Sequence, residues 1–309
     1  MADQQGFLIR FWGVRGSYPT PGPHTLRHGG NTSCVEVQVG GRTLILDAGS
    51  GIIRLGEKLM HQHDGADLNL SLFLTHGHGD HLIGFPFFAP LFNPHTHLHL
   101  FGPRLAGQSV EQLVTPLMSP PYFPVDVRTL PSHRSFHTIT DAQSIAWKQG
   151  SVVPALMEEG NGPDMAKRAS REAKAEVRVM AKFTNSHPLD GAVVYRIEYA
   201  GRSLVYATDV EWQHGCEDAF LDFVNGADVL IHDAQYTMHD YQMATHGFGH
   251  STIEMATEAA RDAHVGELVL FHHEPTYDDD QLDRMEVEAQ ARFAHTRSAC
   301  EGMEIDLLA

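Results

Sequence analysis

The run Thr75-His76-Gly77-His78-Gly79-Asp80-His81 decides how the rest of this chain is interpreted. It holds the metal-ligating side chains of His76, His78, Asp80 and His81, spaced by glycines that permit a tight turn. Buried imidazoles and carboxylates need polar partners, and divalent cations satisfy all of them together. Imidazole nitrogen and carboxylate oxygen suit zinc, with manganese and iron as alternatives. The run therefore predicts a metal site, which a histidine-rich surface turn explains less well.

Apolar runs around this motif predict a series of short strands. Residues 68–75 form one such run, so the motif follows the carboxyl end of a strand, where open α/β sheets bind ligands. The other expected strands cover residues 7–12, 33–39, 42–47, 191–199, 203–208, 228–232 and 267–271. A helix is expected over 251–264, and 82–91 is expected to be a buried, aromatic-rich segment. We expect one domain, 1–309, with an inserted loop and short helix at 151–176.

Three histidines mark a further strand. His95, His97 and His99 alternate with Thr96, Leu98 and Leu100, which is the period of a strand with one buried face. The apolar residues predict the buried face and the histidines the solvent face. Spacing of this kind arises more often from an exposed polar face than from catalysis.

The composition narrows the classes of partner. Lys and Arg total 22 against 39 for Asp and Glu, so the net charge is 22 − 39 = −17, which repels polyanions. We therefore expect no DNA partner, and the charge disfavours RNA. Cys34, Cys216 and Cys300 are odd in number and widely spaced, which predicts neither disulfides nor a zinc-thiolate site and fits a reducing cytoplasm. The chain has neither a secretory signal pattern nor an apolar run of about 18 residues, so a soluble cytoplasmic protein without a membrane partner is expected.

The pattern His-x-His-x-Asp-His after an apolar strand resembles the signature of the metallo-β-lactamase superfamily. The resemblance implies an α/β fold, the αββα sandwich of two mixed sheets with helices outside. It also implies two divalent metal ions, the first held by His76, His78, His187 and Asp209 and the second by Asp80, His81, Asp209 and His272. His273 is the alternative to His272, which we prefer because it is the first residue past its strand. Asp47 matches a position that supports the metal ligands from behind, although a turn cap explains it equally well.

A second motif resembles the ribonuclease Z-like phosphodiesterase branch of this superfamily. Gly249-His250-Ser251-Thr252 opens a helix, and Asp233 ends the strand Leu230-Ile231-His232-Asp233. In this interpretation His250 is the general acid and Asp233 stabilises its protonated ring. Asp80 both binds metal and orients the nucleophile, although a role as metal ligand alone fits the sequence equally well. A simple helix cap explains His250 and Ser251 about equally well. The amino-terminal Arg15, Arg27 and Asn31 resemble residues of cyclic-nucleotide phosphodiesterases, but a structural role is favoured for them.

The leading functional hypothesis is hydrolysis of a small phosphodiester, with a cyclic nucleotide as first candidate, by a hydroxide that two metals activate. The tRNA-processing enzymes of the branch carry a long arm between the third histidine and the bridging aspartate. Residues 188–208 leave no room for such an arm, so tRNA 3′ processing is a weaker alternative. A thioester or lactone hydrolase on the same metal cradle is the other enzymatic alternative, and a metal-dependent sensor is the non-enzymatic one. A homodimer is expected only from the resemblance.

Overall fold

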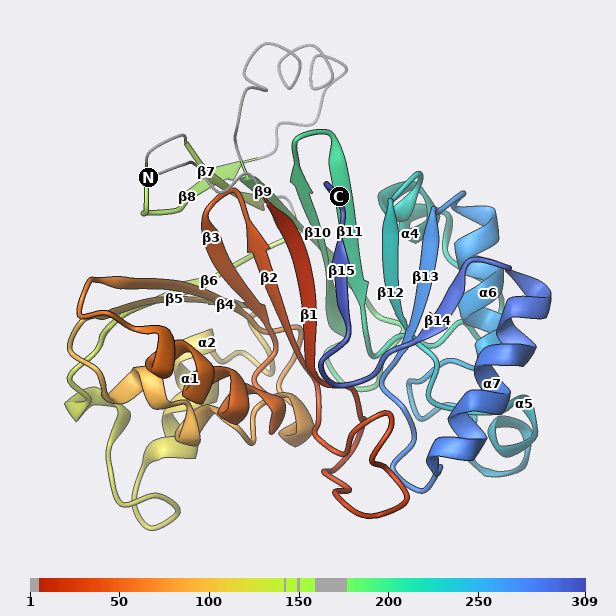
Figure 1. The fold of residues 1–309 in the computed structure, drawn as a ribbon, viewed down its shortest axis with the longest axis horizontal. Helices are drawn as coiled ribbons and strands as arrows, with labels where there is room; N and C mark the ends of the chain where they lie inside the picture. The colour runs from red at the N-terminus through yellow and green to blue at the C-terminus, as the bar shows by residue number, and fades with distance from the viewer. Residues whose placement is uncertain (1–5, 142, 149–150, 159–176) are drawn as a thin grey trace.

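Two mixed β-sheets stack face to face, and helices cover the outer face of each sheet (Figure 1). The computed structural model describes residues 6–141, 143–148, 151–158 and 177–309. This arrangement confirms the predicted αββα sandwich. No helix among the residues so described is both long and apolar enough to cross a bilayer.

The first sheet has seven strands in the order β15-β1-β2-β3-β4-β5-β6. Its strands are β1 (Phe7–Gly13), β2 (Cys34–Val39), β3 (Arg42–Leu46), β4 (Leu68–Phe73), β5 (Thr96–Gly102), β6 (His133–Thr138) and β15 (Glu304–Asp306). Strands β1, β2 and β3 pair antiparallel, whereas β3 to β6 pair parallel. The carboxyl ends of β3 and β4 therefore meet at one edge, and the histidine-rich run follows β4 there.

The second sheet has eight strands in the order β14-β13-β12-β11-β10-β9-β7-β8. Its strands are β7 (Gln143–Trp147), β8 (Ala155–Glu158), β9 (Val177–Thr184), β10 (Ala192–Tyr199), β11 (Arg202–Ala207), β12 (Val229–Asp233), β13 (Glu267–Phe271) and β14 (Thr296–Ser298). Strands β11 to β14 run parallel, so their carboxyl ends also share an edge. The last residues of β12 and β13 are buried throughout because the strands are covered on both faces.

Helices complete the two outer layers. The first sheet carries α1 (Gly51–Gln62) and α2 (Val110–Val114), and the second carries α4 (Asp218–Val224), α6 (Ile253–Asp262) and α7 (Asp279–Arg292). The short α5 (Met238–Asp240) continues into a π-helical turn, η6 (Tyr241–Thr245). Turns of 3-10 helix are η1 (Gly79–His81), η2 (Phe85–Phe87), η3 (Ala89–Phe92), η4 (Thr115–Met118) and η5 (Val127–Thr129).

The apolar core has three parts that correspond to the layers. Between the sheets, alternate residues of β1, Phe7, Ile9 and Phe11, pack with Tyr195 and Phe271. The face of α1 that carries Ile52, Leu55 and Leu59 packs on the first sheet at helical spacing. The alanines of α6 pack closely on the second sheet. Burial of these surfaces fixes both sheets, so the loops at their shared edge rest on a rigid base.

Two sequence expectations differ from the structure in detail. Residues 82–91 form 3-10 turns rather than one buried segment, and Ile83 and Phe87 are exposed because such turns display side chains on all sides. In the expected insertion at 151–176, Ala155–Glu158 form β8, an edge strand paired with β7, instead of a loop. Residues 159–176, where the short helix was expected, lie outside the described residues.

Candidate metal centre

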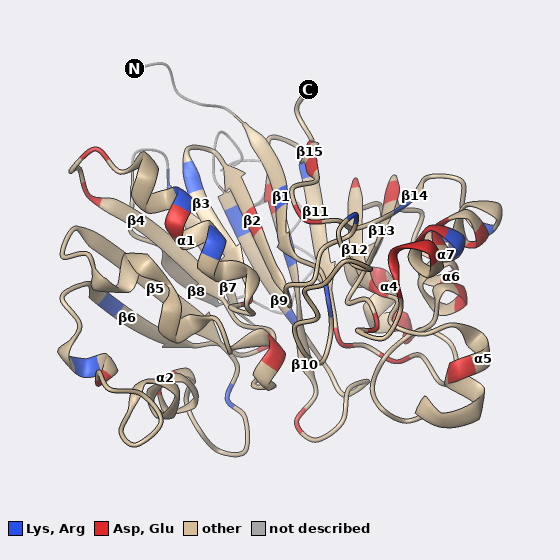
Figure 2. Ribbon diagram, turned by 60° about the horizontal axis from the view of Figure 1, so that its bottom comes forward, with Lys and Arg blue, Asp and Glu red and all other residues tan. Residues whose placement is uncertain are grey.

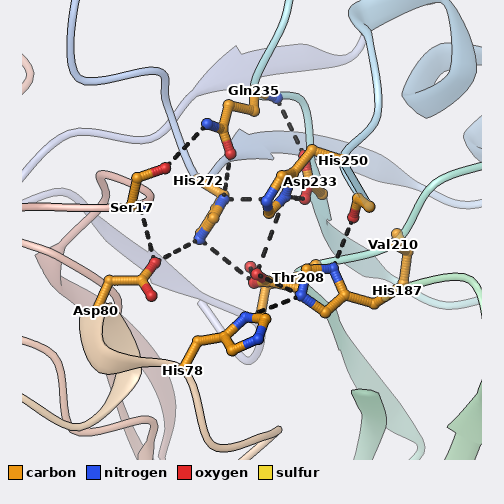
Figure 3. A network of polar contacts seen from close by, with 12 residues as sticks. Ser17, His78, Asp80, His187, Thr208, Val210, Asp233, Gln235, His250 and His272 are labelled. Carbon is orange, nitrogen blue, oxygen red and sulfur yellow. Dashed lines mark hydrogen bonds and ion pairs between the residues drawn. The ribbon is translucent and has the colours of Figure 1, made fainter. Parts of the chain in front are cut away.

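The predicted metal ligands come from loops that follow strands of both sheets, and the structure brings all of them together. Figure 3 shows His78, Asp80, His187 and His272 of this set pointing toward one another. The ligand atoms of His76, His78, His187 and Asp209 lie within 4.8 Å of one another. Those of Asp80, His81 and His272 form a second group within the same limit. The first group is the set predicted for the first metal, and the second group is the set predicted for the second metal without Asp209.

Asp209 lies between the two groups. Its Oδ1 is 3.5 Å from His76 Nε2 and 3.8 Å from His187 Nε2. Its Oδ2 is 3.1 Å from His81 Nε2 and 3.3 Å from His272 Nε2. A carboxylate that turns one oxygen toward each group has the arrangement of a bridging ligand.

The far nitrogens of the histidines are held by oxygen atoms, which leaves the near nitrogens directed at the centre. His76 Nδ1 contacts Thr75 Oγ1 at 3.0 Å, His187 Nδ1 contacts the Gly249 carbonyl at 2.8 Å, and His272 Nδ1 contacts Gln235 Oε1 at 2.9 Å. His76 Nε2 is buried without a hydrogen-bond partner. Metal-ligating histidines are usually oriented in this way, so these residues fit divalent cations.

Asp47 contacts the metal ligands from behind, and the structure favours this supporting role over a turn cap. Its fully buried carboxylate accepts hydrogen bonds from the Thr75 amide at 2.8 Å and from the Tyr206 hydroxyl at 3.0 Å. The same group contacts His81 Nδ1 at 2.8 Å. Asp47 thus connects the start of the histidine-rich run to a ligand at its end and to the opposite sheet.

The backbone adopts the left-handed conformation at three of these positions. The φ angles of Asp47, Asp209 and His272 are 61°, 57° and 61°, each just past the end of a strand. Non-glycine residues adopt such angles at a cost of about 1–3 kcal/mol, and they cluster at functional sites. The turn lets the side chain leave the strand and face the centre.

Charge and burial perturb the ionisation of the cluster. Burial opposes ionisation of Asp209, but the imidazoles of His272 and His81 outweigh it and hold the pKa of Asp209 well below its usual range. Burial lowers the pKa of His76 and of His187. At His81 burial is outweighed by Asp209 and Asp80, which raise the pKa of this ring well above its usual value. The neutral rings of His76 and His187 and the ionised carboxylate of Asp209 are the forms that metal ligation needs.

His250 lies beside the cluster and pairs with Asp233. His250 Nδ1 is 2.7 Å from Asp233 Oδ2, and the ring stacks on His272 with centroids 4.8 Å apart. Burial disfavours the charged ring, but Asp233 reverses this effect and raises the pKa of His250 to about 9. Asp233 Oδ1 also accepts the amides of Gln235 and Ser251, which fixes the carboxylate. The pairing with Asp233 therefore favours the protonated ring.

Glu211 positions the loop that carries His250, and sequence reasoning missed it. Its carboxylate accepts the Gly247 and Gly249 amides at 2.7 and 2.8 Å. Gly249 has a φ of +93°, and a Cβ at this position would lie 2.4 Å from His187 Nδ1. Only glycine allows this approach between the loop and the third histidine.

Ser17 and Gln235 were also missed. The Ser17 amide donates to Asp80 Oδ2 at 2.8 Å, and Gln235 Nε2 donates to Ser17 Oγ at 3.2 Å. Because Gln235 Oε1 also contacts His272, these residues connect the amino-terminal loop to the second ligand group. The signal in the sequence was weak: Ser17 belongs to a Gly-Ser pair, and Gln235 follows the noted Asp233 by two positions.

Other residues considered from the sequence lie away from the centre. His273 is buried with Nε2 on the Ala299 carbonyl at 3.0 Å, so only His272 of the pair joins the cluster. Arg15 is buried and donates to the carbonyls of Gly29, Glu274 and Tyr277. Arg27 pairs with Asp280 and Asp283, and Asn31 with Glu301. These contacts fit the structural roles that were favoured.

Comparison with known proteins identifies the class. Residues 42–273 match the family model of the beta-lactamase superfamily domain, so the chain belongs to the metallo-β-lactamase superfamily of hydrolases. Its relatives include Ribonuclease Z of Brevibacillus brevis, 28% identical over 79% of this chain and 83% of the relative. Ribonuclease Z of Thermoplasma acidophilum is 27% identical over 97% of this chain and 96% of the relative.

A solved structure supports the same fold. The metallo-beta-lactamase fold protein YhfI from Bacillus subtilis superposes with a TM-score of 0.66 at 19% identity, covering 98% of this chain and 100% of YhfI. The predicted family and fold are thus confirmed. The names of the two relatives do not support the expectation that RNA is disfavoured as a partner, which rested on net charge and on one short interval.

Proposed function

We propose that this chain is a metal-dependent phosphodiesterase that cleaves a small phosphodiester, with a cyclic nucleotide as first candidate. The observation that carries the proposal is the contact of 2.7 Å between His250 and Asp233 beside the two ligand groups. Phosphodiester cleavage expels an alkoxide, which needs a proton from a positioned acid. A thioester hydrolase expels a thiolate and has less need for such an acid, whereas a lactone also expels an alkoxide, so the lactone alternative is left to the substrate panel.

Two divalent cations, with zinc as first candidate, would be held by the two groups described above. His76, His78, His187 and Asp209 would hold one, and Asp80, His81, Asp209 and His272 would hold the other. Bound cations supply Lewis acidity, which makes a water molecule acidic enough to act as nucleophile near neutral pH and offsets the charge of the phosphate.

The residues of the chain supply orientation and protons. The hydrogen bond from Ser17 and the contact with His272 fix one oxygen of Asp80, so this carboxylate can orient the attacking water. His250 directs Nδ1 at Asp233, and among the described residues its Nε2 has no hydrogen-bond partner, so it can donate to the leaving alkoxide. Asp233 is a positioning residue that keeps His250 protonated.

Shape and charge support a small substrate. The interval between His187 and Asp209 is filled by β10 and β11, which pair as a hairpin through Tyr199 and Arg202. Acidic residues gather on α6, α7 and the adjoining loops (Figure 2), so this flank of the molecule repels a long polyanion.

Cleavage of RNA, such as tRNA 3′ processing, is the second candidate. It is favoured by the relatives named Ribonuclease Z, which match nearly the whole chain. The same His250, Asp233 and ligand groups would serve that reaction, so the two candidates differ in substrate size and not in chemistry.

A substrate panel on protein saturated with Zn²⁺ tests the proposal. It includes bis-p-nitrophenyl phosphate, cyclic mono- and dinucleotides, a precursor tRNA with a 3′ trailer, a thioester and a lactone. We expect turnover of a small phosphodiester that a chelator abolishes. Cleavage of the precursor tRNA alone would favour the second candidate. Turnover restricted to the thioester or lactone, or none at all on any phosphodiester, would overturn the proposal.

A further inference from the structure

The histidines of β5 and β6 form a second cluster, separate from the candidate metal centre. In the parallel pairing His97 lies opposite His133, and Phe101 lies opposite His137. Paired residues of neighbouring strands share a face, so these histidines and His99 all point to the same side of the first sheet. We name His97, His99, His133 and His137 the histidine face.

The rings of the histidine face contact one another and the Phe101 ring. His99 Nδ1 lies 3.1 Å from His137 Nε2. His97 stacks on His133 with centroids 4.7 Å apart, and His137 stacks on Phe101 at 4.6 Å. The stacking on Phe101 fixes the orientation of the His137 ring and so holds its nitrogen toward His99.

A nitrogen–nitrogen approach of this kind has a counterpart in the same molecule. His78 and His187 approach at 3.0 Å, and His81 and His272 approach at 3.2 Å, within the groups proposed to hold cations. Two imidazoles on one tetrahedral zinc, with bonds of about 2.0–2.1 Å, bring their nitrogens to roughly 3.3 Å apart. The distance between His99 and His137 is therefore close to what a shared metal requires.

The surroundings leave the pair accessible. His99 and His137 are half-buried, and the neighbouring His97 side chain is 39% exposed. Burial lowers the pKa of both His99 and His137, which favours the neutral ligand form.

The cluster is distinct from the proposed catalytic centre. His99 pairs with Ser71 of β4, which lies five residues before His76, or roughly 16 Å along an extended strand. A cavity of about 260 Å³ adjoins this part of the sheet and is lined by Asp67, Asn69, Ser71 and Trp147. Asp67 Oδ1 is 3.9 Å from His97 Nε2, so an acidic group stands at the border of the histidine face.

We propose that His99 and His137 bind one divalent transition-metal ion outside the catalytic centre, with solvent completing its coordination. Neutral imidazoles are preferred ligands of Zn²⁺, Ni²⁺ and Cu²⁺, and do not select Mg²⁺ or Ca²⁺. The competing explanation is a hydrogen bond between two neutral rings, which needs no metal.

Equilibrium dialysis against Zn²⁺ distinguishes these explanations. The proteins are the full chain, His99→Gln, His137→Gln, and the control His24→Gln, which removes an exposed imidazole elsewhere. We expect the wild type and the control to hold one equivalent of Zn²⁺ more than either variant. All four should hydrolyse bis-p-nitrophenyl phosphate at equal rates if the proposed function holds, but the metal count does not depend on that result.

Two further measurements keep the test decisive. Thermal unfolding of the metal-free proteins checks that the variants fold, and His97→Gln, which changes a neighbouring imidazole outside the pair, should keep the additional Zn²⁺. Equal Zn²⁺ content in the wild type and in folded His99→Gln and His137→Gln would overturn the proposal. So would an additional equivalent that Mg²⁺ displaces as readily as Ni²⁺.

Discussion

Replacement of Asp233 by Asn should convert His250 from a charged ring to a neutral one at moderately alkaline pH. The carboxylate raises the pKa of His250 to about 9, whereas an unperturbed histidine has a value near 6.5. At pH 8 these values correspond to protonated fractions of about 0.9 and about 0.03. If protonated His250 is the general acid, Asp233→Asn should lower the rate about 30-fold or more at pH 8 and much less at pH 6, because burial still disfavours the charged ring in the variant.

The direction of the pH dependence follows from the role of His250 as a proton donor. An acid works only when protonated, so activity is present below the pKa of His250 and is lost as pH rises through it. In the wild type the rate should therefore fall at or below about pH 9, because bound cations nearby would counteract Asp233 and lower the pKa of His250. In Asp233→Asn this fall should move to lower pH.

The assay compares rates on two substrates over a range of about pH 5.5 to 10, which spans the expected fall in each protein. A phosphodiester with an alkoxide leaving group needs the acid, whereas bis-p-nitrophenyl phosphate expels a stable anion and needs it much less. We therefore expect the loss with the alkoxide substrate and only a small change with the other. Equal losses on both substrates, or a loss independent of pH, would refute the assignment of His250 as the acid.

Three further predictions test the supports of the centre. Asp47→Asn should weaken Zn²⁺ binding about 10- to 100-fold because the contact with His81 loses its charge. Competition with a chromogenic chelator measures the affinity, and an unchanged affinity would mean that Asp47 supports the fold and not the metal ligands. Gly249→Ala should abolish phosphodiesterase activity because the added Cβ meets His187, and wild-type activity in a rate assay would contradict the close approach of these two residues. Asp209→Ala should reduce the bound Zn²⁺ by at least one equivalent, measured by elemental analysis, and full occupancy would exclude a bridging role.

Local patterns explain why much of the fold was predictable. The alternation of Phe7, Ile9 and Phe11 predicts β1, and the apolar run before the histidine pair predicts β13 at the bounds observed. The strand ends then place the predicted ligands at one edge. Short strands such as β14 and β15, at three residues each, carry no detectable period and were not predicted.

The missing parts of the site depend on contacts between distant residues. Ser17 and Asp80 are 63 positions apart, and Ser17 and Gln235 are 218 apart. The backbone amide of any residue except proline can donate to a carboxylate, so the residue type of Ser17 does not indicate its role. Glu211 is a similar case, because its partners are two loop amides.

The ligands proposed for the cations are divided between the two sheets. His76 to His81 follow β4 of the first, whereas His187, Asp209 and His272 follow β9, β11 and β13 of the second. Cations held there would cross-link the two sheets at one edge and would oppose their separation during unfolding. A ligand at 100 times its Kd adds about 2.7 kcal/mol to the stability of the folded state. Occupancy of the centre should therefore be readable from the melting temperature alone, before any substrate is known.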